Sequence, residues 1–178
     1  MKKALFLLLL LAATPSISQQ LESGTVIPEY GKTYPIASPE FKTDTNAVLK
    51  VVFDVDRSFK ALKPNALIET AARFLNMHEK AGVNSENMKV ALVLHGQSVN
   101  DVLKNEYYTV KNPGVSQNPN LKLIEALSKN GVEIILCGQS ATHHKVTREK
   151  ASEHITFALS AMTALVQLQN DGYQLIKF

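Results

Sequence analysis

Short apolar runs rich in β-branched residues alternate along this chain with segments of helical periodicity. The runs at 48–55, 88–95 and 132–137 are apolar at most positions, which is typical of strands buried on both faces. The run at 154–160 predicts either a strand or the first turns of a helix, and its β-branched and aromatic residues favour a strand followed by a helix. Residues 173–178 predict a closing strand. The alternation therefore predicts an α/β fold, a three-layer α/β/α domain with a mainly parallel five-stranded sheet and right-handed crossovers.

Helical spacing of apolar residues marks the segments between these strands. A helix is expected over 64–80, with Pro64 in its first turn. A second helix is expected over 120–129, capped by its first residue, an asparagine. Residues 138–150 are expected to be helical for part of their length. The polar stretch at 105–120 predicts a loop.

Residues 1–18 have the three parts of a secretory signal peptide. Lys2 and Lys3 form a positive start, an apolar stretch follows through Ala13, and the residues up to Ser18 resemble a small-x-small cleavage site. The apolar stretch is short for a membrane span, although an uncleaved anchor is the alternative. We expect cleavage near Ser18, export to the periplasm, and no membrane span in the mature protein.

Residues 19–46 are polar and contain three prolines, which disfavour a regular helix. We expect an extended N-terminal arm here. The arm is either a loose linker or a segment whose apolar side chains pack on the body or on a neighbouring subunit. Residues 47–178 then form a single α/β domain.

The composition excludes several classes of protein. The chain has 178 residues and a formal net charge of +3, with 19 Lys and Arg against 16 Asp and Glu, so we expect no nucleic-acid partner. Its one cysteine excludes an internal disulfide and a multi-thiolate metal site built by a single chain. The phosphate-binding patterns GxGxxG and GxxxxGKS/T are missing, as are CxxC and GxSxG. We therefore expect no cofactor and no serine hydrolase.

Polar residues follow the second and third expected strands in a shared pattern, x-Gly-Gln-Ser, with x a histidine at 95 and a cysteine at 137. In open α/β sheets, ligands bind beyond the carboxyl ends of the strands. Glycine at such a position permits close approach of the backbone. We expect a ligand-binding site formed by His95, Gly96, Gln97, Gly138, Gln139, Ser140 and His143.

Cys137 is the strongest candidate for a catalytic residue. A thiol at the start of a helix is biased toward the thiolate, and the basic stretch of His143, His144, Lys145 and Arg148 follows it. Such a thiolate would attack a sulfane sulfur or a disulfide. The alternative is a buried, inert cysteine that fills space at the end of the strand.

His95 is expected to orient a ligand or to act as a base, and the alternative is a histidine bonded to a loop backbone. By residue type, His95, Cys137 and the 143–144 pair would suit a transition metal. Adjacent histidines point in different directions on a helix, and the spacing matches no zinc motif, so we expect no metal. Asp54 and Asp56 are expected to point to opposite faces of the sheet and to act as caps or face solvent.

Three segments resemble parts of a known family. KVALVLHGQSV (89–99) looks like its second strand and HG turn, and residues 118–140 look like its helix, Gly-Val pair and third strand ending in cysteine. ALVQLQNDGYQLIKF (164–178) is similar to its last helix, Gly-Tyr pair and closing strand. On these motifs, residues 47–178 resemble the DsrE/DsrF-like family, which includes TusD-like sulfur-relay subunits.

The resemblance implies a compact α/β/α domain that assembles as dimers, trimers or hexamers. In the sulfur-relay members, a cysteine at the end of the third strand accepts persulfide sulfur and passes it on. Cys137 matches that position, and His95 and Gly96 match the HG turn. The relay members carry an Arg-Gly pair where this chain has residues 143–146, and they work in the cytoplasm with partner subunits.

The residues and the resemblance together predict an exported DsrE/DsrF-like protein in which Cys137 serves as a persulfide sulfur carrier or in a sulfurtransferase-like reaction. Its expected partners are copies of itself and a sulfur donor or acceptor, either a protein or a small thiol. The alternative is a non-catalytic oligomeric module of the same fold that binds a small ligand or is purely structural.

Overall fold

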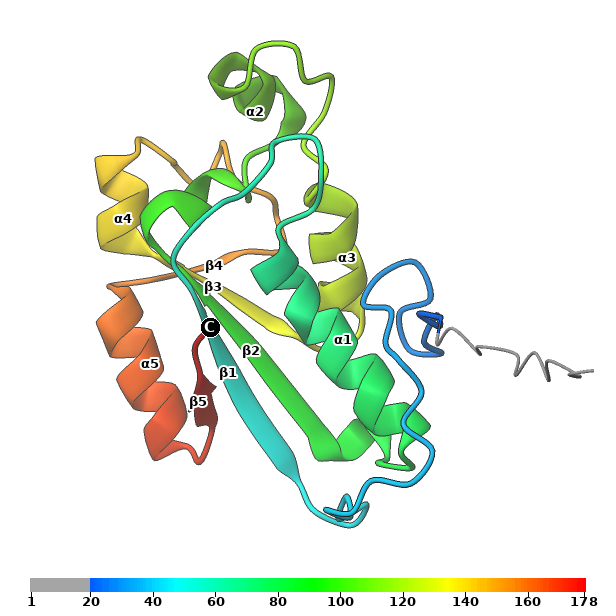
Figure 1. Cartoon of the computed structure of the whole chain (residues 1–178). Coiled ribbons are helices and arrows are strands. Elements are labelled where there is room, and N and C mark those ends of the chain that lie inside the picture. Colours follow the sequence, from blue (N-terminus) through cyan, green and yellow to red (C-terminus); the bar gives the residue numbers. More distant parts are fainter. Residues whose placement is uncertain (1–19) are drawn as a thin grey trace, which may run out of the picture.

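The computed structural model describes residues 20–178 and centres on a five-stranded sheet (Figure 1). The strands are β1 (Leu49–Val55), β2 (Met88–Leu94), β3 (Glu133–Cys137), β4 (Thr156–Ala158) and β5 (Gln174–Ile176). They lie in the order β4-β3-β2-β1-β5, and every neighbouring pair is parallel. The predicted α/β fold with a parallel five-stranded sheet is confirmed.

Helices cover both faces of this sheet. They are α1 (Ala66–Lys80), α2 (Asn105–Lys111), α3 (Leu121–Lys129), α4 (Gly138–His143) and α5 (Ala161–Asn170), with 3₁₀ helices η1 (Ser85–Asn87) and η2 (Gly96–Asn100). α1 and α3 lie on one face and α5 on the other (Figure 1). Because successive residues of a strand face opposite sides, Phe53 belongs to a larger core and Val52 to a smaller one that includes α5.

The start of α1 follows from its capping residue. The Asn65 side chain accepts a hydrogen bond from the Leu67 N–H at 2.9 Å, which satisfies a free donor of the first turn. Pro64 was expected inside this turn, and it lies instead just before the cap. The helix buries an apolar stripe at helical spacing, made of Ile68, Ala71, Ala72 and Leu75.

Two local predictions are wrong. The stretch 105–120 contains α2, whose Tyr108 is 3% exposed and donates from its hydroxyl to the Ala61 carbonyl at 3.1 Å. This tertiary contact stabilises a helix too short to show clear periodicity. α3 does begin after Asn120, but the Asn120 side chain accepts from the Asn65 N–H at 2.7 Å and makes no cap.

Residues 20–46 lie against α1. Ile27 is 1% exposed and belongs to the larger core. Asn76 of α1 accepts from the Ile27 N–H at 2.9 Å and donates to the Tyr30 carbonyl at 2.8 Å. The signal peptide expected at 1–18 lies outside the described residues. Between residues 20 and 178, no helix is long and apolar enough to cross a membrane.

Candidate functional site

Three polar side chains end three neighbouring strands on one face of the sheet. Val52, Val93 and Cys137 share the smaller core, which packs against α5. Side chains two residues apart in a strand lie on the same face, so Asp54 and His95 join Cys137 on the α5 face. The three side chains stand at the carboxyl ends of β1, β2 and β3, the edge at which open parallel sheets bind ligands.

Cys137 is the last residue of β3 and the N-cap of α4. It is 5% exposed, and its Sγ accepts a hydrogen bond from the Ser140 N–H at 3.5 Å. Burial raises the pKa of this thiol, but hydrogen bonds from the Ser140 hydroxyl and from the backbone of Ser140, Ala161 and Gln139 outweigh it. The net pKa of Cys137 therefore lies below its usual 9.0, and its thiolate forms more readily than that of an unperturbed cysteine.

Gly96 and Gly138 let the loops after β2 and β3 pack closely against neighbouring backbone at this edge of the sheet. Gly96 has a φ of +55°, and a Cβ on it would lie 2.5 Å from the Asp56 carbonyl oxygen. A Cβ on Gly138 would lie 2.6 Å from the Ala158 carbonyl oxygen. The Gly96 N–H donates to Ser140 Oγ at 3.1 Å, so the turn after β2 contacts the same hydroxyl that bonds to the thiol.

His95 is held by a buried carboxylate. Its Nε2 lies 2.6 Å from Asp54 Oδ1, and Asp54 is 8% exposed. Lys177, just after β5, donates to Asp54 Oδ2 at 2.7 Å, and this hydrogen bond raises the pKa of Lys177. Each oxygen of the carboxylate therefore has its own partner, the imidazole on one side and the ammonium on the other.

The expectation that Asp54 and Asp56 point to opposite faces is wrong. Residues two apart in a strand share a face, and Lys177 Nζ lies 2.7 Å from Asp54 and 3.5 Å from Asp56. Asp54 belongs to the site and is neither a cap nor a solvent-facing residue. An acidic residue inside an apolar strand is the signal that could have identified it, whereas Lys177 carries no such signal.

Three residues of the expected ligand site have exposed side chains, namely Gln97, Gln139 and His143. The backbone of Gln139 nevertheless contributes a hydrogen bond that lowers the pKa of Cys137. His143 ends α4, at the opposite end of that helix from the thiol. The structure separates His143 from the residues that it brings together, which are Cys137, His95, Gly96, Gly138, Gln139 and Ser140.

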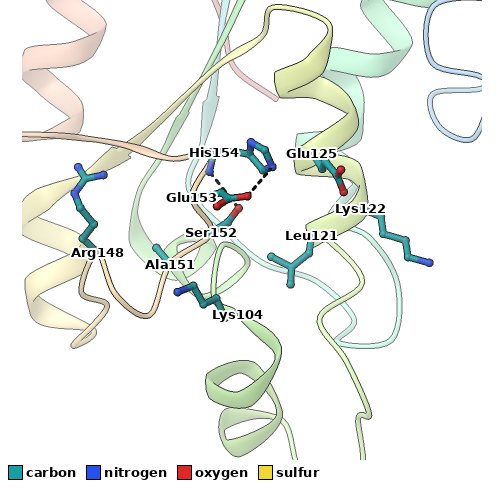
Figure 2. Close-up of a pocket in the computed structure, with 9 residues that line it drawn as sticks. All are labelled: Lys104, Leu121, Lys122, Glu125, Arg148, Ala151, Ser152, Glu153 and His154. Carbon is teal, nitrogen blue, oxygen red and sulfur yellow. Dashed lines mark hydrogen bonds and ion pairs between the residues drawn. The ribbon is translucent and has the colours of Figure 1, made fainter.

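Other candidate sites are less specific. A cavity of about 570 Å³ lies beside α3 and the segment before β4 (Figure 2). Lys122 and Arg148 lie on opposite sides of this hollow, and Arg148 already stacks on the Phe157 ring at 4.7 Å. The lining mixes both signs of charge and indicates no ligand class. Among residues 20–178, no group of three or more His, Cys, Asp or Glu side chains is arranged to hold a metal ion.

A cavity of about 360 Å³ beside η2 and α2 contains a buried carboxylate that the sequence did not indicate. Asp101 is 4% exposed, and its Oδ2 accepts from Ser58 Oγ at 2.8 Å and from Asn65 Nδ2 at 2.6 Å. Burial raises the pKa of Asp101 to about 6, although these two hydrogen bonds lower it. Because Asn65 caps α1, Asp101 joins the start of α1 to η2.

The fold and the site together define a class of protein. It is an α/β/α domain on a parallel five-stranded sheet, with a thiol at the edge formed by the carboxyl ends of the strands. The model of the DsrE/DsrF-like family matches residues 50–178, and the chain belongs to this family. The resemblance to this family that the sequence indicates is confirmed.

Two solved structures share the fold. The protein of unknown function MTH1491 from Methanobacterium thermoautotrophicum is 16% identical, with a TM-score of 0.52 over 73% of this chain and 99% of that one. The ychN protein from E. coli is 16% identical, with a TM-score of 0.53 over 73% of this chain and 99% of that one. At this identity, the likeness shows the fold alone. A comparison with curated proteins finds no match.

Proposed function

We propose that this DsrE/DsrF-like protein is a sulfur carrier or sulfurtransferase-like protein in which Cys137 accepts and releases persulfide sulfur. The observation that carries the proposal is the set of hydrogen bonds that lowers the pKa of Cys137 despite its burial. The thiolate, and not the thiol, is the nucleophile in sulfur exchange. A thiol biased toward the thiolate at the ligand edge of the sheet suits this reaction.

The proposed reaction is a displacement at sulfur. The Cys137 thiolate attacks the outer sulfur of a hydropersulfide, R–S–SH, so that a new S–S bond forms and the old one breaks. The donor leaves as the thiolate R–S⁻ with the bonding electron pair, and the protein becomes Cys137–S–SH. Onward transfer to an acceptor thiolate is the same displacement in the other direction, so no oxidant or reductant is consumed.

The low exposure of Cys137 selects small reactants. The residue is 5% exposed, and the loops after β2 and β3 meet beside it through the hydrogen bond from the Gly96 N–H to Ser140 Oγ. A terminal sulfur atom is small enough to approach at this edge, whereas a bulky aromatic reagent needs the loops to move. We expect small alkyl sulfur donors to react with the folded protein faster than bulky ones.

Loading and unloading of sulfur test the proposal. The folded protein is exposed to an alkyl hydropersulfide, freed of excess donor, and then mixed with a small acceptor thiol. Intact mass should show a gain of one sulfur atom after the first step and its loss after the second. Cys137→Ser should gain nothing at either step, since the chain has one cysteine. A wild-type protein that is never loaded contradicts the proposal.

A second candidate is a non-catalytic module that holds a small sulfur compound at the same edge. The burial of Cys137 favours it, because a buried thiol often fills space without reacting. In that case thiosulfate raises the Tm of the wild-type protein and of Cys137→Ser alike, and no covalent sulfur is found on either.

We propose further that the protein acts after export, in the periplasm, as a homo-oligomer that exchanges sulfur with a donor or acceptor protein or a small thiol. The signal-like residues 1–18 support export. Exposed apolar side chains at the start and along the outer side of α5 support self-association, namely Leu159 (73% exposed), Met162 (75%) and Val166 (56%).

A further inference from the structure

His95 and Cys137 are neighbours in the sheet. β2 and β3 pair in parallel with Leu94 opposite Leu136, and His95 continues the extended backbone with φ −149° and ψ −175°. The next pair in this register is His95 and Cys137, on strands that lie about 4.8 Å apart. Both side chains are on the α5 face, so the imidazole and the thiol occupy adjacent positions in one row.

A hydrogen bond between the two loops keeps this row together. The Gly96 N–H donates to Ser140 Oγ at 3.1 Å, and the Ser140 N–H donates to Cys137 Sγ at 3.5 Å. The residue directly after His95 is therefore linked to the sulfur through the single residue Ser140. This contact is independent of the strand register and places the same two residues side by side.

The contact with Asp54 determines which nitrogen of the His95 ring can accept a proton. An ionised carboxylate only accepts hydrogen bonds, so Nε2 carries the hydrogen in the 2.6 Å contact with Asp54 Oδ1. Nδ1 of the neutral imidazole then keeps a lone pair. Within residues 20–178, no hydrogen bond of the structure engages His95 Nδ1.

We propose that His95 is the proton-transfer residue of the Cys137 reaction, acting through Nδ1, and that Asp54 is its positioning residue. The inference rests on the proposed sulfur transfer and adds the path of the proton to it. The Asp54–His95–Cys137 row has the composition of other nucleophile–base–carboxylate arrangements, in which the carboxylate orients the imidazole and stabilises its charged form.

In one turnover, the proton moves from Cys137 to His95 and then to the departing thiolate. His95 Nδ1 takes the proton of the Cys137 thiol, which leaves a thiolate and an imidazolium. The thiolate forms its bond to the outer sulfur of R–S–SH, and R–S⁻ departs with the electron pair of the broken bond. The imidazolium gives the proton to R–S⁻, so that R–SH and neutral His95 remain beside Cys137–S–SH.

An acid is useful here because alkyl thiolates are poor leaving groups. A free alkyl thiol has a pKa of about 8.5, so its thiolate leaves slowly unless a proton arrives as the S–S bond breaks. A positioned acid or base contributes roughly 10² to 10⁴ in rate when a proton moves in the transition state. The benefit disappears when the leaving group is already a weak base.

The charged groups beside His95 form a short chain of alternating sign. Asp54 contacts the ring directly, and Lys177 binds the other oxygen of the same carboxylate at 2.7 Å. Asp56 lies 3.5 Å from Lys177, and Arg57 lies 3.2 Å from Asp56. The two carboxylates and two cations balance one another, and the carboxylate in contact with the imidazole is the buried one.

The test compares two small electrophiles whose leaving groups differ in their need for a proton. An alkyl hydropersulfide releases a basic thiolate, whereas methyl methanethiosulfonate releases a sulfinate, which is a weak base. Rates are measured on the full chain at pH values at which the thiols of the variants are equally ionised. His95→Gln should slow sulfur uptake from the hydropersulfide by about 10²-fold or more and change the thiosulfonate rate less than about threefold.

Two further variants separate the role of His95 from general damage. His154→Gln replaces a histidine that precedes the amino end of β4, whereas Cys137 lies at the carboxyl end of β3, and this variant should behave like the wild-type protein. Asp54→Asn should slow hydropersulfide uptake selectively and move the pH profile of that reaction, because the imidazolium loses its carboxylate. A merely structural role for Asp54 would leave the pH profile in place.

The outcomes distinguish this inference from the proposed function. A wild-type protein that reacts with the thiosulfonate but gains no sulfur from the hydropersulfide overturns both. The inference alone is overturned if the wild-type protein takes up sulfur and His95→Gln takes it up equally fast. It is also overturned if His95→Gln reacts more slowly with both electrophiles to the same extent.

If His95→Gln does not fold, the wild-type protein is measured in heavy water. A solvent isotope effect with the hydropersulfide and none with the thiosulfonate supports the proton transfer, and equal effects overturn it.

Discussion

Ser140 joins the two loops that meet at the thiol. Its hydroxyl accepts from the Gly96 N–H at 3.1 Å and bonds to Cys137, and its own N–H lies 3.5 Å from Sγ. One small side chain therefore stabilises the thiolate and also sets the spacing between the turns after β2 and β3.

Ser140→Ala should raise the pKa of Cys137, because the charged form loses a hydrogen bond. At pH 7 the rate of reaction with methyl methanethiosulfonate should fall by roughly tenfold, the lower end of the effect of losing one hydrogen bond to a charged group. Thr142→Ala changes an exposed side chain of the same helix and serves as the matched control. Equal rates for the wild-type protein and Ser140→Ala contradict the role given to this hydroxyl.

The residues of the site were predictable only where the strand ends marked them. Cys137 and His95 follow apolar runs, and every parallel strand of the sheet ends at the same edge. Lys177 reaches Asp54 only because β5 returns to lie beside β1, a contact between distant parts of the chain. His143 was included on closeness in sequence, and α4 carries it to its far end.

At the scale of elements, the start of α1 and the 3₁₀ helix η2 share one buried carboxylate. Asp101 accepts from Ser58 Oγ at 2.8 Å and from Asn65 Nδ2 at 2.6 Å, while its carbonyl accepts from Asn118 Nδ2 at 2.8 Å. Burial raises the pKa of Asp101 from 3.8 to about 6, and burial, followed by the charge of this same carboxylate, raises the pKa of Tyr108 to about 12.

The stability of the domain should depend on pH through Asp101. Its pKa is higher in the folded than in the unfolded state, so the folded state binds the proton more tightly between the two values. The contribution of Asp101 to the free energy of unfolding is therefore greatest at low pH. It falls as the pH rises from about 4 to about 6, by at most about 3 kcal/mol.

Urea unfolding from pH 4 to 8 measures this effect as the difference between the wild-type protein and Asp101→Asn. The asparagine keeps an acceptor oxygen and does not titrate, so other groups cancel in the difference. The free energy of unfolding of the wild-type protein relative to the variant should decline from pH 4 to pH 6 and stay level above it. A difference that does not change with pH contradicts the raised pKa of Asp101.

The elements were predictable where a local pattern and the tertiary structure agree. β1 and β2 are long apolar runs, and their residues are buried at most positions, so pattern and structure coincide. α2 depends on burial of Tyr108 and its bond to Ala61, which no local pattern encodes. Asparagine is a residue type that caps helices, but the side-chain oxygen of Asn120 accepts a hydrogen bond from the Asn65 N–H instead.

At the scale of the whole molecule, α5 leaves apolar side chains exposed on its outer side. One side of α5 packs on the sheet through Ala161, Ala164 and Leu168, while Met162 and Val166 on its other side are exposed. The thiol lies near the start of this helix, since Cys137 and Ala161 belong to the same core cluster. A second copy that covers α5 would lie close to the candidate site.

The proposed homo-oligomer should depend on this helix face. The double variant Met162→Glu with Val166→Glu places charges on the apolar surface and should lower the mass measured by sedimentation to that of one chain. Val110→Glu, at another exposed apolar residue (79%), is the matched control and should keep the wild-type assembly. A wild-type protein that sediments as a monomer, or a double variant that sediments like the wild type, contradicts the assignment.

The central claim is that Cys137 accepts sulfur as a thiolate in the folded protein. Its most direct test is the intact mass of the folded chain after brief exposure to an alkyl hydropersulfide at neutral pH, beside Cys137→Ser under the same conditions. The account predicts a gain of one sulfur atom on the wild-type protein, removed by a reducing thiol, and no gain on the variant. An unchanged wild-type mass, under conditions in which a free small thiol is converted, would contradict it.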